Sequence, residues 1–359
     1  MHRRFLIQRA GLAGVLAAGV APAVHAQALT RWRLASSFAK SQDLLFGAAE
    51  SFARKVGEMS GGRFQVEVHA AGELMSARDV LDGVQRGAIE ACHTSGALFV
   101  DHNEAFAFGA AIPFGMNARQ LNAWMTEGNG LRLSREFHAG FGAVGFPCGS
   151  AGAQRLGWFA RELRGASDFK GLKVRFDGLA GRVIARLGGV VQGPASGSDL
   201  RDAFSKGLGA AEGLSPYDDQ KLGLPKVARF CHTPGWWAGA MQLDLLVNQK
   251  AFDALTPDYK AILQSACATV HAELIGRYDA RNPAALRELA GAGAQIKPFP
   301  RPLLDATFKA SMDLCHALDR SNPAWKKLHG DYRAFQQGQL FADRFTEAPF
   351  DAYLQGAKL

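Results

Sequence analysis

The sequence predicts an α/β clamshell: two lobes with mixed, partly parallel sheets, joined by hinge strands and followed by long C-terminal helices. Strands and amphipathic helices alternate over the first hundred residues in βαβαβ order, which is typical of parallel sheets with helical crossovers. Removal of an N-terminal leader leaves about 330 residues, too many for one compact core and enough for two lobes. Residues 301–359 have mainly helical periodicity.

The first 26 residues have the organisation of an export signal. Three arginines lie within the first nine residues, residues 10–21 are an apolar run rich in Ala and Gly, and Val-His-Ala at 24–26 is a small-residue exit site. The run is too short to span a bilayer. The Arg3-Arg4 pair indicates twin-arginine export, although its spacing differs by one residue from the usual twin-arginine motif. An ordinary Sec signal fits the segment equally well. Cleavage after residue 26 removes three arginines and no acid, so the net charge falls from +8 to +5.

The elements of the first lobe follow from the spacing of apolar residues. These alternate with polar residues in the strands and recur every three or four positions in the helices. Ligands bind beyond the carboxyl ends of parallel strands, so the stretches after Ser36 and His93 are candidate pocket walls. The expected strands are 31–36, 64–68 and 89–95, and the expected helices are 44–59 and 77–86.

The second lobe follows a strand at 144–150, with Ser150 near a hinge. Strands at 229–234 and 241–248 lead back to the first lobe, and two or three strands that cross between lobes make a clamshell hinge. The elements expected between them are a strand at 172–176, a helix at 178–187, a strand near Val190, a helix at 200–207 and a strand at 210–213.

The remainder of the chain is predominantly helical. Residues 251–288 predict a long helix, which Asn282-Pro283 should bend or break. A late strand at 294–299 precedes helices at 303–318 and 332–345. The predicted division is a signal peptide at 1–26, lobe I at 27–150 plus about 241–300, lobe II at 151–240, and a C-terminal helical region at 301–359 that packs across the lobes.

A possible anion-binding cation lies on the strand at 172–176. Leu172, Val174 and Phe176 alternate with Lys173 and Arg175, so Arg175 faces away from Val174. A guanidinium near the end of a short strand can clamp a carboxylate through two parallel hydrogen bonds. On the pattern alone, an exposed arginine on a sheet edge is an equal alternative.

Composition and motifs exclude several classes of function. The chain is 48% hydrophobic and 21% charged, as expected of a soluble globular protein. It contains no G-x-S-x-G, H-E-x-x-H, P-loop or dinucleotide fingerprint. Basic and aromatic residues are not clustered as a nucleic-acid binder requires. We therefore predict a binding protein rather than an enzyme, with an unrecognised exported hydrolase as the alternative.

The cysteines also fit an exported binding protein. Five are present without a CxxC pair, and we expect them to be mostly buried and unpaired. Three Cys-His dipeptides suit zinc by chemistry, but neighbours on a strand point to opposite faces, so we favour core cysteines with satisfied histidines. The dipeptides are Cys92-His93, Cys231-His232 and Cys315-His316.

Two nearby segments of the sequence resemble a known protein family. Gly-Ser-Ala-Gly-Ala-Gln-Arg-Leu-Gly-Trp-Phe at 149–159 and Asp-Phe-Lys-Gly-Leu-Lys-Val-Arg at 168–175 resemble the solute-binding proteins of tripartite ATP-independent periplasmic (TRAP) transporters, above all the branch that binds 2-oxo acids. The resemblance runs from about residue 30 to about residue 261. It implies a periplasmic binding protein that closes on a small organic carboxylate and delivers it to membrane permease subunits. Signalling is the alternative use of such a receptor.

The resemblance also implies a set of site residues. Arg175 would form a salt bridge with the ligand carboxylate, and Gln154 would contact ligand and cation. Glu212 would bind the cation, although a structural salt bridge is the alternative for this residue. The predicted substrate-binding residues are Arg175, Gln154, Gly213, Glu212, Phe99, Trp237 and Ala238, and the predicted metal ligands are Glu212 and Gln154.

This chain departs from the family pattern at several of these positions. Leu98 and Phe99 lie where the family has tyrosines, and Gly213 replaces a tryptophan, so we expect more open space and a ligand larger or more apolar than pyruvate, branched or aromatic. Ala238 replaces a second glutamate, which leaves few oxygens for calcium. We therefore expect no cofactor, a monovalent or divalent cation as an open alternative, and binding that does not require a divalent ion. Some receptors of this branch exchange a C-terminal helix, so a homodimer through that helix is a further expectation.

Overall fold

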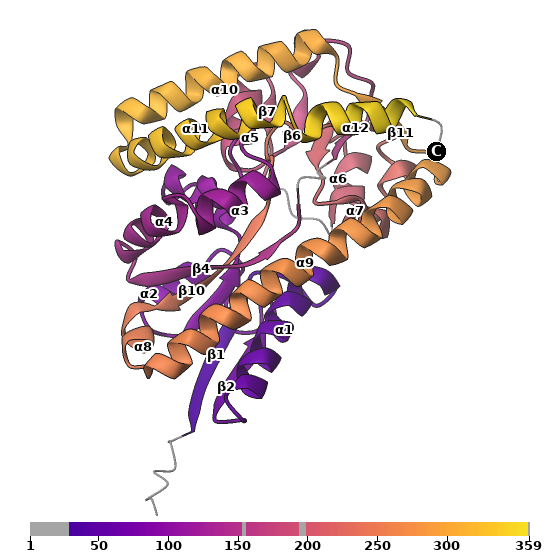
Figure 1. The fold of residues 1–359 in the computed structure, drawn as a ribbon. Helices are drawn as coiled ribbons and strands as arrows, with labels where there is room; N and C mark the ends of the chain where they lie inside the picture. Colours follow the sequence, from indigo (N-terminus) through magenta and orange to yellow (C-terminus); the bar gives the residue numbers. More distant parts are fainter. Residues whose placement is uncertain (1–28, 153–155, 194–198, 358–359) are drawn as a thin grey trace, which may run out of the picture.

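The structure, a computed structural model, describes residues 29–152, 156–193 and 199–357. It is a mixed α/β protein with two separate sheets and long C-terminal helices, which confirms the predicted fold class (Figure 1). The first sheet has the strand order β2-β1-β3-β10-β4 and the second the order β11-β9-β5-β8-β6-β7. Among the described helices, none combines the length and apolar character that a membrane crossing requires.

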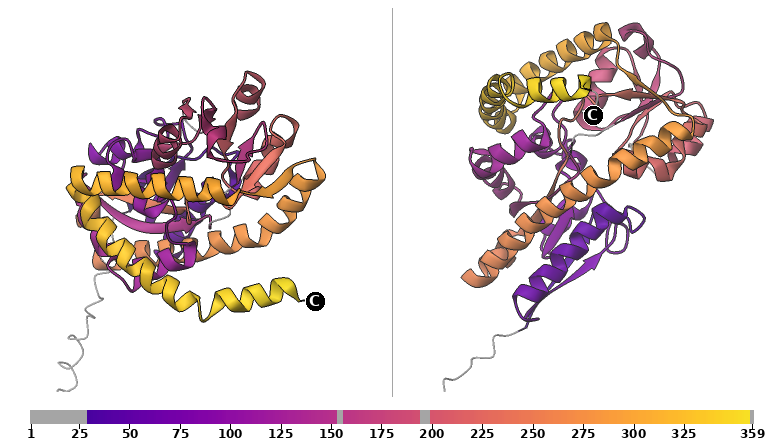
Figure 2. Two further views of the ribbon diagram at one scale, coloured as in Figure 1. Left: turned by 90° about the horizontal axis from the view of Figure 1, so that it is seen from above. Right: turned by 45° about the vertical axis from the view of Figure 1, so that its right-hand side comes forward.

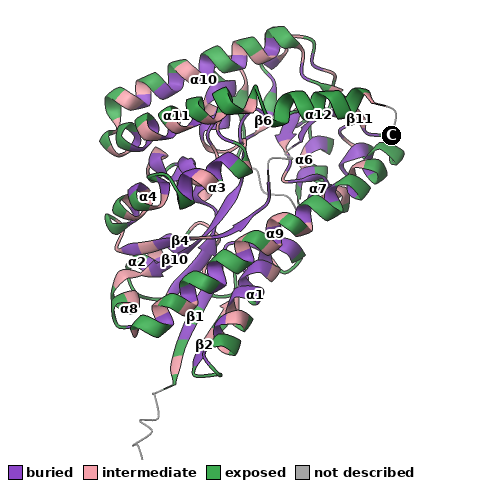
Figure 3. Cartoon of the chain, in the orientation of Figure 1, coloured by how far each residue is buried: buried purple, intermediate pink, exposed green. Residues whose placement is uncertain are grey.

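The first sheet is the centre of lobe I. Its strands β1, β2 and β3 are parallel, whereas β10 runs antiparallel to both β3 and β4. Strand β10 and the carboxyl half of β1 are buried, as Figure 3 shows in purple, whereas the edge strand β2 is mostly exposed or half-buried. The strands are β1 (Thr30–Ser36), β2 (Phe64–His69), β3 (Ala91–Thr94), β4 (Ala143–Ser150) and β10 (Gln242–Asn248), and the helices are α1 (Asp43–Met59), α2 (Val80–Gln85), α3 (Ala118–Thr126) and α4 (Gly130–Ala139).

The second sheet is the centre of lobe II. Strand β6 is parallel to β7 and β8, whereas β5 is antiparallel to β8 and β9. The strands are β5 (Gly157–Phe159), β6 (Lys173–Arg175), β7 (Val190–Val191), β8 (Ala210–Glu212), β9 (Phe230–Thr233) and β11 (Gln295–Pro298), and the helices are α5 (Gly178–Arg186), α6 (Leu200–Ser205) and α7 (Pro216–Leu222).

The chain passes between the lobes at the ends of β4 and β10. There the backbone N–H of Ala151 donates to the carbonyl of Met241 at 2.9 Å, and the N–H of Met241 donates to the carbonyl of Gly152 at 3.1 Å. The two crossing segments are thus hydrogen-bonded to each other. In clamshell proteins a few residues at such crossings absorb the change in backbone dihedrals when the lobes close.

The third crossing is helix α9 (Pro257–Gly291), which follows α8 (Gln249–Asp253). Its 35 residues span about 50 Å at ~1.5 Å per residue, and Figures 1 and 2 show it running beside both lobes. Because α9 ends in lobe II, β11 pairs with β9 in the second sheet. Our assignment of residues up to about 300 to lobe I was therefore wrong for β11.

The predicted break at Pro283 does not occur, since α9 continues to Gly291. The adjacent Asn282 is 1% exposed, and its Oδ1 accepts a hydrogen bond from the backbone N–H of Tyr217 at 3.1 Å. Packing against α7 thus holds the turn that contains the proline.

The C-terminal helices α10 (Arg301–Ser321) and α11 (Pro323–Asp343) form a hairpin over both lobes. Helix α10 contacts α5 of lobe II, and α11 contacts α3 and α4 of lobe I. The hydroxyl of Tyr332 accepts a hydrogen bond from the Met116 N–H at 2.6 Å, and Gln336 Nε2 donates to the carbonyl of Phe114 at 2.9 Å. One apolar cluster accordingly contains residues of lobe I, lobe II and this hairpin.

The last helix, α12 (Glu347–Gly356), has no buried residue. Figure 2 shows it extending away from the body, and Figure 3 shows its surface in green. Together with the end of α11 it carries a row of exposed apolar side chains, which we call the C-terminal apolar face: Leu340, Phe341, Phe345, Phe350, Tyr353 and Leu354.

Candidate ligand-binding site

The carboxyl ends of three parallel strands of lobe II bring the candidate site together. Arg175 ends β6, Gln192 follows β7 and Glu212 ends β8. Strand β6 lies between the other two, with Val174 opposite both Val191 and Ala210. Ligands of α/β sheets bind beyond this edge of parallel strands. The position of β6 also removes the alternative that Arg175 is an arginine on a sheet edge.

Arg175 is held by an acidic side chain of its own lobe. Its side chain is 20% exposed, and Nη1 lies 2.9 Å from both Oδ1 and Oδ2 of Asp199. The two residues line a cavity of about 290 Å³, large enough for a small organic acid. The other lining residues are Gln192, Asp202, Ala203, Lys206 and Leu208.

Glu212 is held by the segment that follows Arg175. Its Oε1 accepts the backbone N–H of Asp177 at 2.9 Å. The carboxylate of Asp177 in turn lies 3.1 Å from Nη2 of Arg78, which belongs to lobe I. Arg78 also donates to the carbonyl of Leu98 at 3.2 Å through Nη1. The guanidinium of Arg78 in lobe I therefore contacts Asp177 of lobe II, whose backbone holds Glu212.

The walls that we predicted after Ser36 and His93 lie side by side in lobe I, because Ser36 and His93 are partners in the parallel pairing of β1 and β3. The hydroxyls of Ser37 and Thr94 are 2.7 Å apart, and Ser37 Oγ also lies 2.9 Å from the carbonyl of Ala77. Phe38 packs edge-to-face on His93 with ring centroids 5.8 Å apart. The lobe I edge is thus rigid and partly polar.

Trp237 lies deep in the protein, next to the strand of Arg175. Its ring packs edge-to-face on Phe176 at 5.1 Å and on Trp236 at 5.7 Å. The indole Nε1 is buried and has no hydrogen-bond partner among the described residues. A buried indole N–H normally has an acceptor, so this group is a candidate donor to a ligand.

Two other predicted site residues lie in apolar surroundings. Phe99 is fully buried in lobe I, where its ring contacts Phe106 at 5.5 Å and His102 at 6.1 Å. Ala238 is 1% exposed and belongs to the apolar cluster that joins the lobes to the C-terminal hairpin. Gln154 lies outside the described residues.

Gly213 does not leave the open space that we predicted. A Cβ at this position would lie 2.0 Å from Asp219 Oδ2. The carboxylate of Asp219 is fixed by Trp158 Nε1 at 2.8 Å and by the backbone N–H of Leu214 at 2.9 Å. The volume beside Gly213 is therefore filled by Asp219, and the prediction of a larger pocket at this point was wrong.

The described residues offer few ligands for a metal. No group of three or more His, Cys, Asp or Glu side chains within the described ranges could hold an ion. All five cysteines are buried and unpaired, as we expected. In the Cys-His dipeptides of β3 and β9 the imidazoles have backbone partners: His93 Nε2 lies 2.9 Å from the Cys148 carbonyl, and His232 Nε2 accepts the Leu163 N–H at 3.3 Å.

Three residues of the site were not predicted from sequence patterns: Arg78, Asp177 and Asp199. Asp177 could have been noticed, because it lies two residues beyond Arg175 and directly before a helix. Arg78 and Asp199 reach the site only through the packing of the lobes and of α6.

Two lobes, paired crossing strands and a guanidinium at the carboxyl edge of parallel strands define a receptor that closes on a small anionic solute. The chain belongs to family 7 of the bacterial extracellular solute-binding proteins, whose model matches residues 35–320. The chain is 38% identical over 330 residues to a monocarboxylate 2-oxoacid-binding periplasmic protein of Nostoc sp. (strain PCC 7120), with 91% of this chain and 90% of that protein covered. Both the family and this relative are described as binding proteins.

Three solved structures of TRAP transporter solute-binding proteins have the same fold. The protein of Bordetella bronchiseptica, a dimer with calcium and picolinate in one site, has a TM-score of 0.87 at 36% identity over 91% of this chain and 97% of that one. The Pseudoalteromonas atlantica protein, with sodium and pyruvate, has a TM-score of 0.86 at 29% identity over 92% and 99%. The Colwellia psychrerythraea protein, with calcium and pyruvate, has a TM-score of 0.86 at 27% identity over 91% and 99%.

Proposed function

We propose that this protein is the periplasmic receptor of a TRAP transporter and that it binds a small organic monocarboxylate, a 2-oxo acid or a compact aromatic acid, for delivery to the membrane permease. The observation that carries the proposal is Arg175 at the carboxyl end of β6, beside a cavity of about 290 Å³. A guanidinium there can form two parallel hydrogen bonds with a carboxylate.

The relatives support this class of ligand. The Nostoc relative binds monocarboxylate 2-oxo acids, and the solved structures hold pyruvate or picolinate. The buried Nε1 of Trp237 adds a donor close to the strand of Arg175, suited to a second oxygen of the ligand. The cavity lining offers Arg175 as the cation for the carboxylate, and the Trp237 N–H lies near the strand of Arg175 but outside this lining.

The first test is a thermal-shift panel of pyruvate, 2-oxoisovalerate and picolinate, with the neutral amide of picolinate as the control. A ligand that binds only the folded state raises the melting temperature, and the increase grows with the logarithm of its concentration relative to Kd. We expect at least one acid to stabilise the protein and the amide to have no effect. An absence of stabilisation by every acid, with and without calcium, would contradict the proposal.

The second test concerns Arg175. Arg175→Ala should weaken binding of the stabilising acid by about 3 kcal/mol, or roughly 100-fold, and Arg175→Lys should also bind poorly because an ammonium cannot form the two-pronged contact. Calorimetric titration measures both, and circular dichroism checks the fold. Arg161→Ala is a matched control, since this arginine lies in the same lobe and donates to the backbone carbonyl of Asp168. Wild-type affinity in Arg175→Ala would show that another group binds the carboxylate.

We also propose that the protein is a homodimer through its C-terminal apolar face. Phe345, Phe350 and Tyr353 are 72%, 61% and 74% exposed, and exposed aromatic rows of this kind mark association surfaces. The Bordetella bronchiseptica relative was crystallised as a dimer. A second copy would bury these rings and give α12 the packing that it lacks within its own chain.

A further inference from the structure

The first turn of α1 and the helix α7 meet across the boundary between the lobes. Asp43 begins α1 in lobe I, and Tyr217 and Lys221 lie on α7 in lobe II. Tyr217 Oη donates to Asp43 Oδ2 at 2.8 Å, and the ammonium of Lys221 pairs with Oδ1 of the same carboxylate. Side chains of lobe II therefore bind both oxygens of one carboxylate of lobe I.

A second cation completes this group, which we call the Asp43 cluster: Asp43, Tyr217, Lys221 and Arg281. Arg281 lies on α9, and its Nη1 is 3.6 Å from Asp43 Oδ2 and 3.0 Å from Tyr217 Oη. Lys221 Nζ and Arg281 Cζ lie 3.9 Å and 5.1 Å from the centroid of the Tyr217 ring, within the range of cation–π interactions. The phenol thus holds two cations of its own lobe beside the carboxylate of the other lobe.

The Asp43 cluster is accessible to water. The side chains of Asp43, Lys221 and Arg281 are 48%, 34% and 45% exposed. Tyr217 is partly buried against the apolar cluster that lobe I shares with α9. Solvent screens exposed ion pairs and can replace their contacts at small cost when the two partners separate. The contact between α1 and α7 can therefore form and break without exposing a large apolar surface.

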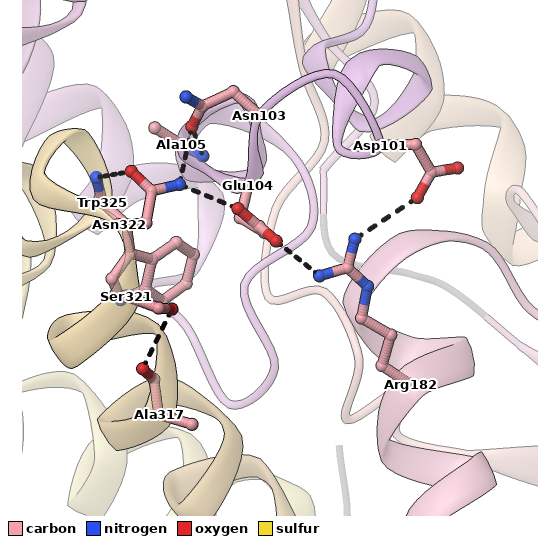
Figure 4. A network of polar contacts seen from close by, with 9 residues as sticks. All are labelled: Asp101, Asn103, Glu104, Ala105, Arg182, Ala317, Ser321, Asn322 and Trp325. Atoms are coloured by element: carbon pink, nitrogen blue, oxygen red, sulfur yellow. Dashed lines mark hydrogen bonds and ion pairs between the residues drawn. The ribbon is translucent and has the colours of Figure 1, made fainter.

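The junction between the lobes at α5 is of a different kind. Arg182 of α5 pairs with Glu104 of lobe I at 2.6 Å, and Glu104 also accepts a hydrogen bond from Asn322 of the C-terminal hairpin at 2.8 Å (Figure 4). Val100 of lobe I and Leu179 of lobe II are buried in the apolar cluster that joins both lobes to this hairpin. Separation here would expose apolar surface, at a cost that grows with its area. The Asp43 cluster can therefore open more readily than the junction at α5.

The Asp43 cluster is separate from the candidate site. Of the described residues that line the cavity beside Arg175, none belongs to the cluster. A contact made only between closed lobes stabilises the closed state relative to the open one. An acid enclosed between the lobes leaves only after they open, so such a contact slows dissociation and has little effect on association.

We propose that the Asp43 cluster is a latch that holds the lobes closed over the bound acid and sets how long the acid stays bound. Asp43, Tyr217 and Lys221 are positioning residues in this role, because they join the lobes outside the cavity. Loss of the Asp43 carboxylate should speed dissociation about fivefold, the upper range for an exposed ion pair. This inference rests on the proposed function, since it requires that the lobes close on an acid.

The experiment measures the association and dissociation rates of pyruvate and picolinate by stopped-flow tryptophan fluorescence, in about 150 mM salt to screen long-range steering. Mature full-length wild type is compared with Asp43→Asn, with Asp43→Lys and with the charge-reversed pair Asp43→Lys plus Lys221→Asp. Asp43→Asn should release the acid about fivefold faster at an association rate within about twofold of wild type. Asp43→Lys should release it faster still, because like charges then meet. The charge-reversed pair should return the dissociation rate to within about twofold of wild type.

Glu90→Gln is the matched control, since Glu90 forms a partly exposed ion pair with Arg33 at 3.2 Å inside lobe I and should change neither rate. Any of three results would overturn the latch: a wild-type dissociation rate in Asp43→Asn, an equal acceleration in Glu90→Gln, or a charge-reversed pair that still releases the acid as fast as Asp43→Lys. Slower association with unchanged dissociation would also overturn it, because Asp43 would then guide the acid to the site.

A wild type that binds neither acid contradicts the proposed function, and small-angle X-ray scattering without any acid then tests the latch by itself. Asp43→Lys should have a larger radius of gyration than wild type, because repulsion separates α1 from α7, and the charge-reversed pair should restore the wild-type value. Equal radii of gyration in wild type and Asp43→Lys would show that the Asp43 cluster does not hold the lobes together.

Discussion

Arg175 and Asp199 form an ion pair within lobe II, with Nη1 of the arginine 2.9 Å from both carboxylate oxygens. The carboxylate of Asp199 is thus already hydrogen-bonded to the guanidinium that we propose as the partner of the ligand carboxylate. A ligand carboxylate must displace Asp199 or share the guanidinium with it. Because Asp199 is 54% exposed, solvent screens the pair and makes this exchange easy.

We predict that Asp199→Asn binds the carboxylate ligand up to about fivefold more tightly than wild type, because an exposed ion pair contributes at most about 1 kcal/mol. Calorimetric titration with the acid identified by the panel measures the effect. Asp202→Asn is the matched control, since Asp202 lines the same cavity but pairs with Lys206 at 2.7 Å. A clear loss of affinity in Asp199→Asn would instead indicate that Asp199 orients Arg175 for the ligand.

Gly213→Ala should destabilise the protein by about 1–3 kcal/mol, as overpacked core substitutions do. The added methyl group would collide with Asp219 Oδ2, and Asp219 cannot move without losing its hydrogen bonds from Trp158 and Leu214. Urea denaturation measures the free energy of unfolding. Gly276→Ala is a control within helix α9, where an added Cβ meets no atom within 4 Å and should not destabilise. Equal stability of Gly213→Ala and wild type would contradict the contact.

The buried carboxyl of Asp244 leads us to predict that the free energy of unfolding depends on pH. Burial raises the pKa of this carboxyl to about 7, although the Gln242 amide at 2.7 Å and His93 oppose the shift, while Cys148 adds to it. The folded pKa lies above the unfolded value of about 3.9, so the folded state binds more protons between these values. The contribution of Asp244 to the free energy of unfolding therefore falls as the pH rises from about 4 to about 7.

Asp244→Asn should consequently stabilise the protein at pH values above 7, by up to about 4 kcal/mol, and have little effect near the acidic end of this range. The amide keeps an oxygen that can accept from Gln242. Urea titrations of wild type and variant across this pH range measure the difference. A difference that does not change with pH would show that Asp244 has the same proton occupancy in the folded and unfolded protein.

The C-terminal apolar face should decide the oligomeric state. Phe350→Glu combined with Tyr353→Glu places two charges on this face and should convert a dimer into a monomer of unchanged melting temperature, because neither side chain is packed within its own chain. Light scattering coupled to size-exclusion chromatography measures the mass. Leu74→Glu, at a residue 42% exposed in lobe I, is the control. A wild type that is monomeric at high concentration would contradict the proposal.

Local patterns of the sequence were sufficient to predict most of the elements. Alternation and helical spacing gave β1, β2, α1, α5, β8 and β10 within a few residues, because these elements bury one face and carry its period in their apolar residues. Strand β5 and helices α3 and α4 were not predicted. β5 is only three residues long and buried on all of them, so it has no alternation to detect. Helix α4 begins with glycine at 130, where sequence signals favour a turn.

The sequence by itself determined the two-lobed α/β fold and the placement of Arg175 and Glu212 at the ends of strands, because these follow from short-range periodicity and a long family resemblance. Only the tertiary structure decided which groups meet those side chains. Asp199 reaches Arg175 from 24 residues away, Arg78 reaches Asp177 from 99 residues away across the lobes, and Asp219 fills the space beside Gly213. Such contacts depend on how sheets and helices pack, and the spacing of residues along the chain carries no record of that packing.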